Sequence, residues 1–172
     1  MKKTITALIL AFVLLIGFGP VLTQAGAETM KFKLVSMYEK IEWLEVTQTE
    51  GVKIGLMNRK GLSIFENGEI ATTSCRGLLD TKKGWQGYSS MVFEDGSTLV
   101  LSWKGPTSYS RTADGKYVLY GVKFEYADGT GRFKGIKGSG TFNGKTPQWD
   151  EEYKAKGFAY YEFNGTYTLP SK

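Results

Sequence analysis

The sequence predicts an all-β protein with a single small antiparallel domain of about eight strands, which is enough for a closed β-barrel or a sandwich. From Met30 onward, short runs of alternating apolar and polar residues are separated by turn signals. No stretch keeps the i, i+3, i+4, i+7 spacing of a long amphipathic helix. The chain of 172 residues holds 22 Gly, 10 Phe, 10 Tyr and 4 Trp. Aromatic residues suit strands and glycines suit turns and bends, so composition and pattern agree.

The first 27 residues are predicted to be a signal peptide, and residues 28–172 the barrel domain. Two lysines follow Met1, residues 5–16 are an apolar run, and an Ala-Gly-Ala sequence ends at Ala27. A membrane anchor is the alternative, but a Gly/Pro break interrupts the apolar run and no basic cluster follows it. We therefore expect cleavage after Ala27 and a periplasmic or secreted protein, which meets a membrane only through the signal peptide before cleavage.

The residue types exclude several kinds of chemistry. The chain has no His, so His-based triads, His metal sites and His general bases are excluded. Its one cysteine, Cys75, cannot form an internal disulfide and is predicted to be a buried core residue rather than a reactive thiol. Removing Lys2 and Lys3 with the signal peptide lowers the net charge from +5 to +3, so no nucleic-acid partner is expected. We find no catalytic constellation, and we predict no metal site and no cofactor.

Two turn motifs predict hairpins. Asn67-Gly68 and Asp95-Gly96 each lie between strand-like runs, and both are signatures of a two-residue type I′ turn. In the second hairpin such a turn would pair residues on one face, which we expect to be the core face: Val92 with Leu99, Ser90 with Leu101, and Tyr88 with Trp103.

The second half of the domain holds two further strand candidates. Residues 116–126 form the longest one, with Glu125 on the face opposite to its apolar residues, which are Val118, Tyr120, Val122, Phe124 and Tyr126. An aromatic-rich run over residues 155–169 ends the domain. No linker or fixed-period repeat divides the chain, so one domain is expected.

Residues 128–142, DGTGRFKGIKGSGTF, are the most distinctive segment. No helix pattern and no G-K-[ST] follows its first glycines, which argues against a phosphate loop. Glycines that alternate with Phe133, Ile136 and Phe142 instead predict a strongly bent strand pair at a barrel corner.

This segment resembles the G-x-G-x-F-x-G-x-x-G-x-G signature of the allene oxide cyclase-like barrel superfamily, which includes the dirigent proteins. The chain is most similar to small exported bacterial members without an assigned activity, which share a Gly-Tyr such as Gly87-Tyr88 and an F-x-D-G-S hairpin such as residues 93–97. The resemblance covers residues 61–169 and implies an eight-stranded barrel, often oligomeric, with an apolar cavity. It brings no catalytic residue to this chain.

Five residues are candidates for a ligand-binding site. Aromatic side chains could line a cavity that stacks flat apolar molecules, and a carboxyl in apolar surroundings could acquire a raised pKa. On this basis the candidates are Tyr88, Trp103, Tyr120, Glu125 and Tyr161. The alternative for the aromatic residues is plain core packing, and for Glu125 an outward position in solvent.

The first functional hypothesis is a non-catalytic binding module for a small apolar or aromatic ligand. The alternatives are a cyclase- or isomerase-type enzyme that uses a carboxyl in an apolar cavity, and a structural protein that forms homo-oligomers through half-apolar outer strand faces. An open cavity of roughly 300 Å³ or more would favour ligand binding or catalysis over an assembly role.

Overall fold

The computed structural model describes residues 26–45, 52–105, 109–147 and 157–171. The predicted signal peptide, apart from its last two residues, lies outside this part of the chain. The strands are β1 (Glu28–Glu45), β2 (Lys53–Phe65), β3 (Ile70–Asp80), β4 (Gly84–Phe93), β5 (Thr98–Lys104), β6 (Ser110–Arg111), β7 (Tyr117–Gly129), β8 (Lys137–Pro147) and β9 (Ala159–Thr168). One 3-10 turn, η1, covers Gly131–Phe133. Within the described ranges, no helix is long and apolar enough to span a membrane.

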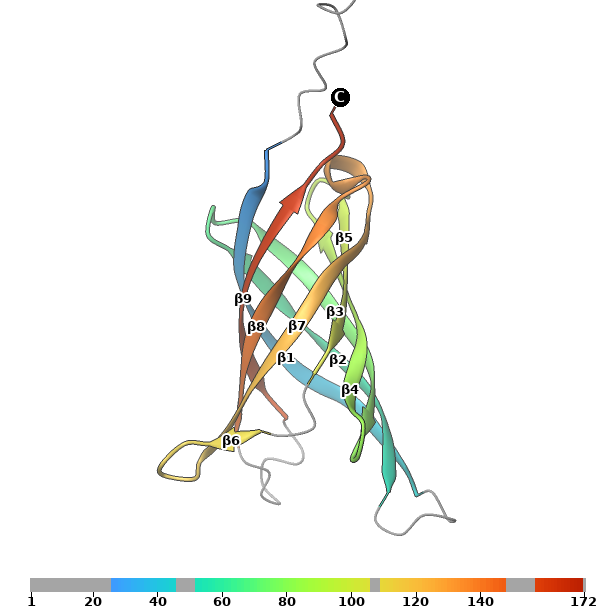
Figure 1. The fold of residues 1–172 in the computed structure, drawn as a ribbon, viewed down its shortest axis with the longest axis vertical. Coiled ribbons are helices and arrows are strands. Elements are labelled where there is room, and N and C mark those ends of the chain that lie inside the picture. The colour runs from blue at the N-terminus through green and yellow to red at the C-terminus, as the bar shows by residue number, and fades with distance from the viewer. Residues whose placement is uncertain (1–25, 46–51, 106–108, 148–156, 172) are drawn as a thin grey trace, which may run out of the picture.

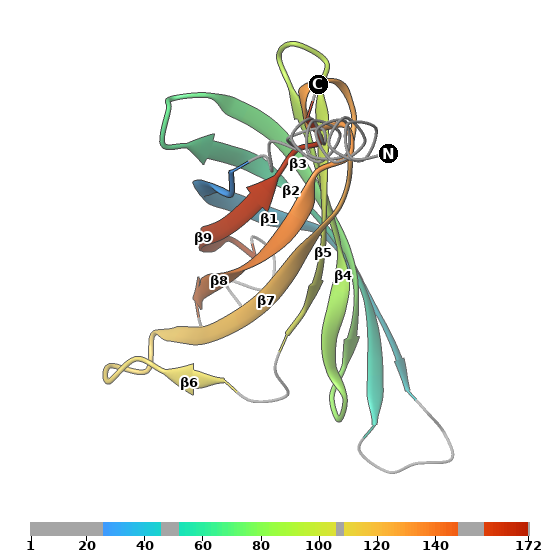
Figure 2. The ribbon, with the colours of Figure 1, turned by 45° about the horizontal axis from the view of Figure 1, so that its top comes forward.

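Eight of these strands form a closed antiparallel barrel, as predicted (Figure 1). The hydrogen-bonded order is β5-β4-β3-β2-β1-β9-β8-β7, and pairing of β5 with β7 closes the ring. The short strand β6 pairs only with β7 and lies outside the ring (Figure 2). The first and last strands are neighbours, because Phe32 of β1 pairs with Phe163 of β9.

Alternation along the strands separates the interior from the outer surface. In β7, Tyr120, Val122, Phe124 and Tyr126 are buried while Glu125 is exposed, as the period-two pattern predicted. Cys75 is also buried, as predicted. The sequence pattern therefore identified the inner face of the longest predicted strand correctly.

The predicted type I′ turns are wrong, and with them the predicted inner face of β4, whereas the predicted inner face of β5 is confirmed. The Phe93 N–H donates to the Ser97 carbonyl at 3.0 Å, which gives a three-residue loop. Gly96 has a φ of 78°, whereas Asp95 does not have a positive φ, so the loop is a type I turn with a glycine bulge. The Asp95 carboxylate fixes this shape by accepting the Ser97 backbone N–H at 2.9 Å.

The longer loop shifts the strand pairing by one residue. Met91 pairs with Leu99, Ser89 with Leu101 and Gly87 with Trp103. Because successive side chains point to opposite faces, the shift moves Tyr88 and Val92 to the outer surface and brings Ser89, Met91 and Phe93 inside. Trp103 keeps its predicted inward position.

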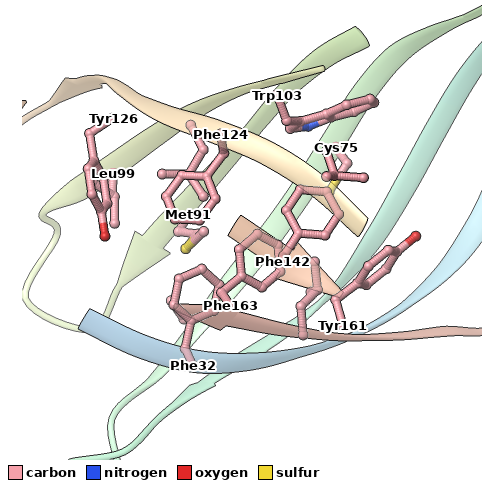
Figure 3. Close-up of a cluster of buried hydrophobic side chains, with 14 of the residues drawn as sticks. Phe32, Cys75, Met91, Leu99, Trp103, Phe124, Tyr126, Phe142, Tyr161 and Phe163 are labelled. Carbon is pink, nitrogen blue, oxygen red and sulfur yellow. The ribbon is translucent and has the colours of Figure 1, made fainter. Parts of the chain in front are cut away.

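Aromatic rings pack against one another in the half of the barrel next to the β2–β3 and β4–β5 turns, and Figure 3 shows part of this cluster. Phe163 stacks on Phe32 with ring centroids 4.3 Å apart, and on Phe142 at 4.4 Å. Phe93 contacts Phe133 of the β7–β8 connection at 4.9 Å. This half is therefore packed core, and it closes the barrel at that end.

The glycine-rich segment spans the end of β7, the loop that contains η1 and the first half of β8, so it lies partly in two paired strands and partly in the loop between them. Gly131, Gly135 and Gly138 have φ values of 58°, 76° and 141°, which glycine adopts without strain. A Cβ on Gly138 would lie 2.1 Å from the Thr166 carbonyl oxygen of β9. These glycines therefore shape the backbone, as expected, with Gly131 and Gly135 in the loop and Gly138 at the start of β8.

Candidate functional site

A cavity of about 450 Å³ occupies the other half of the barrel interior. Its base is the aromatic core, where Phe142 and Phe163 contribute to the lining. Toward the opposite end the lining includes Asp80 at the end of β3, Trp85 near the start of β4, and the exposed Trp43 of β1. The cavity therefore reaches from the middle of the barrel toward the end at which β1 and β3 finish and β4 begins.

Three of the five predicted site residues line this cavity. Trp103 of β5, Tyr120 of β7 and Tyr161 of β9 are buried and contribute to the lining. Tyr88 is 60% exposed on the outer surface, and Glu125 is also exposed there, so neither belongs to the cavity. For Tyr88 the reason is the shifted hairpin register, and for Glu125 it is the alternation of β7.

The polar atoms of the three cavity rings bind to other groups in the wall. The Trp103 Nε1–H donates to Ser89 Oγ at 3.1 Å, and Ser89 Oγ donates to Cys75 Sγ at 3.2 Å. The Tyr120 hydroxyl lies 3.0 Å from the Thr146 hydroxyl and donates to the Tyr161 hydroxyl at 3.2 Å. These bonds hold the rings in place, so the wall is a rigid aromatic surface.

Arg59 of β2 is a cavity-lining residue that sequence reasoning missed. Its side chain is only 2% exposed. The Nε–H donates to Ser36 Oγ at 2.9 Å, and Nη2 donates to the carbonyl oxygens of Ser36 at 3.2 Å and Gly157 at 2.9 Å. The guanidinium carbon lies 3.8 Å from the ring centre of Tyr38. The signal in the sequence was its spacing, since Arg59 is two residues from Met57 in a strand whose inner face is buried.

The groups around Arg59 are neutral near pH 7. Burial raises the pKa of the Tyr161 hydroxyl well above its ordinary value, and burial also raises the pKa values of Tyr38 and the Cys75 thiol. Asp80 differs, because the Lys83 and Lys82 backbone N–H groups donate to its carboxylate and lower its pKa. Asp80 is therefore charged, but it is not a neighbour of Arg59. Arg59 pairs with Cys75, and Asp80 lies five residues farther along, at the end of β3.

The described residues offer little for acid–base or metal chemistry. Asp80 is the one carboxylate among the described residues that line the cavity. No group of three or more Cys, Asp or Glu side chains in the described part of the chain could hold a metal ion. The arrangement suits binding and orientation of a ligand by aromatic faces and one buried cation.

No family model and no curated protein matches the sequence. Among solved structures, the pterocarpan synthase dirigent protein PsPTS1 is similar with a TM-score of 0.47 and 12% identity, over 87% of this chain and 99% of that one. The pterocarpan synthase dirigent protein GePTS1 has a TM-score of 0.46 and 11% identity, over 85% and 88%. Both are dirigent proteins, one of the groups that the glycine-rich segment resembles. A likeness of this degree assigns neither a family nor a function to the chain.

Proposed function

We propose that this protein is an exported binding protein whose barrel cavity holds a small, largely apolar or aromatic molecule. The observation that carries the proposal is that the barrel is packed on one side only and keeps a cavity of about 450 Å³ on the other. This volume lies within the range of roughly 300–1,000 Å³ that is usual for ligand pockets. Rings from Trp103, Tyr120 and Tyr161 form much of the wall and are already fixed by hydrogen bonds. A preformed aromatic wall lowers the entropic cost of binding a flat ligand.

The cyclase- or isomerase-type alternative receives less support. It needs a carboxyl in apolar surroundings, and the carboxyl expected for that role, Glu125, lies on the outer surface. Asp80 lines the cavity, but its backbone hydrogen bonds favour the charged form and work against a general acid.

Binding can be tested with the neutral fluorescent probe N-phenyl-1-naphthylamine, whose emission rises in apolar surroundings. Val118 lines the cavity, and its neighbour Leu119 points to the opposite face of β7. We expect Val118→Trp to weaken probe binding at least tenfold by filling the cavity, and Leu119→Trp to leave it unchanged. Equal effects of the two substitutions would refute the proposal. So would the absence of binding by the wild type at about 1 mM probe, since a Kd of 1 mM already corresponds to a weak binding free energy of about −4.1 kcal/mol.

We also propose that the protein forms homo-oligomers through the outer face of β1, β2 and β3. Val35 and Leu62 are cross-strand neighbours there, and Ile64 pairs with Ile70. All four side chains are more than 40% exposed. Contiguous apolar surface of this kind is typical of contact with another subunit.

A further inference from the structure

We propose that the buried guanidinium of Arg59 binds an anion, and that the ligand of the cavity is an apolar or aromatic molecule carrying a carboxylate. The inference rests on the proposed function, because it requires the cavity to hold a ligand. It adds the chemical class of that ligand and the residue that selects it.

The hydrogen bonds of Arg59 leave one end of the guanidinium unused. Nε and Nη2 are held by Ser36 and Gly157, whereas Nη1 is buried and has no hydrogen-bond partner among the described residues. A guanidinium has five N–H donors, two of them on Nη1. The group is thus fixed in position with two donors still available. A buried polar atom without a partner is costly, and its presence points to a ligand that supplies one.

No carboxylate in the described part of the chain compensates the charge of Arg59. The guanidinium forms no ion pair with any described carboxylate. Its nearest aromatic neighbours, Tyr38 and Tyr161, have ring centres 3.8 Å and 5.6 Å from the guanidinium carbon, and Tyr38 also hydrogen-bonds to Arg59, but neither side chain supplies a negative charge. Arginine does not lose its proton in proteins, so the cation persists when buried. An unpaired charge in an apolar interior is unfavourable, and an entering anion would remove that penalty.

Tyr38 packs against the guanidinium within the cavity wall. The ring of Tyr38 lies over the guanidinium and also forms part of the cavity lining. Tyr38 is located where the β1–β2 pairing shifts register, between Tyr38 and Lys40. Because Arg59 is almost fully covered, an anion reaches Nη1 only when a covering group moves, and the Tyr38 ring, 3.8 Å from the guanidinium carbon, is the candidate for that movement. At this irregular point of β1, movement of Tyr38 would disturb few regular backbone hydrogen bonds between β1 and β2.

The rest of the lining defines the other part of the ligand. Leu34, Met57 and Phe142 contribute apolar side chains to the lining, together with Trp and Tyr rings. A strongly hydrated inorganic anion gains nothing from such a surface, whereas an aromatic acid pairs its carboxylate with Arg59 and stacks its ring on the wall. The combination of one cation with an apolar wall therefore fits an amphiphilic monocarboxylate.

The test compares 2-naphthoate with its methyl ester, which has the same ring but no charge, by isothermal titration calorimetry at pH 7. We expect the wild type to bind the acid at least tenfold more tightly than the ester. In Arg59→Met this preference should fall to near one. The control is Arg76→Met, on the exposed face of neighbouring β3, which should keep the wild-type preference. Arg59→Lys keeps the charge and should retain part of the preference for the acid. If Arg59→Met does not fold, Arg59→Lys replaces it in the comparison.

A second measurement uses only the wild-type protein. The carboxyl pKa of 13C-labelled 2-naphthoate is followed by NMR when free and when bound. Pairing with Arg59 should lower the bound pKa, whereas an apolar cavity without such pairing should raise it. Equal binding of acid and ester, or a raised bound pKa, would overturn the role of Arg59 and leave the binding function standing. Binding of neither compound, together with failure of the neutral probe, would refute the binding function itself.

Discussion

Replacement of Gly138 by Ala is expected to destabilise the barrel strongly. A φ of 141° lies outside the regions open to alanine, and adopting it costs roughly 1–3 kcal/mol. The new Cβ would also lie 2.1 Å from the Thr166 carbonyl oxygen, so β8 and β9 must separate locally and weaken a backbone hydrogen bond worth about 1 kcal/mol. The sum is about 3 kcal/mol. With a urea m-value of about 2 kcal/mol/M, the midpoint of urea unfolding should fall by about 1.5 M.

Gly121→Ala is the matched control for this experiment. Gly121 is an exposed residue of β7 without a positive φ, and a Cβ there would meet only Asn143 Oδ1 at 3.5 Å. Alanine should then be neutral or stabilise the protein by about 0.4–1 kcal/mol, because it restricts the unfolded chain. Tryptophan fluorescence against urea concentration gives both midpoints. Equal midpoints for the two variants would show that the glycine-rich connection does not need its glycines for folding.

Four further outcomes are expected. Burial and the raised pKa of Cys75 should make its thiol unreactive toward Ellman's reagent at pH 8 in the folded protein, and rapid labelling without urea would contradict the structure. Arg132 Nη1 lies 2.6 Å from Glu69 Oε1, and the hydrogen bond from Arg132 lowers the pKa of Glu69. Arg132→Gln should therefore raise the pKa of Glu69 in a 13C NMR titration. An unchanged pKa would show that the ion pair does not persist in solution. Because this lowered pKa favours the ionised carboxylate in the folded state, its stabilising effect is present above the ordinary pKa of Glu and is lost as the pH falls through the lowered value. If the outer apolar face joins subunits, Leu62→Glu should convert the protein to monomers in light-scattering chromatography, and a wild type that is already monomeric at high concentration would refute the oligomer. Mass spectrometry of the protein from its native host should find Glu28 as the first residue, and an intact Met1 would contradict export with cleavage.

The barrel itself was predictable because strand alternation is a local signal. In β7, apolar residues at every second position predicted the inner face that the structure shows. The β4–β5 hairpin was not predictable in the same way. Asp-Gly fits both a two-residue turn and a three-residue loop, and the choice depends on how the Asp95 side chain binds the Ser97 N–H. One residue of loop length exchanges the two faces of β4, whereas β5 keeps its predicted inner face. This exchange moved Tyr88 out of the predicted site.

The candidate site was predicted in its aromatic part only. Trp103, Tyr120 and Tyr161 lie on strands whose apolar faces had to turn inward. Arg59 was missed because a charged residue in a strand is normally placed in solvent. What holds it inside is the pairing of β1 with β2 and β9, which brings the Ser36 oxygens within reach of its side chain, and no local pattern encodes that contact.

The pairing of the first strand with the last also sets the order of events during folding. Phe32 must find Phe163, 131 positions later, before the ring can close. Such distant contacts form slowly, and until they do β1 has an open hydrogen-bonding edge. A growing chain therefore cannot complete the barrel before β9 has been synthesised. For an exported protein, as we propose this one to be, such a delay would leave the chain time to cross the membrane before the barrel closes. Because Tyr161 and Phe163 lie on β9, the same late step also completes the wall of the cavity.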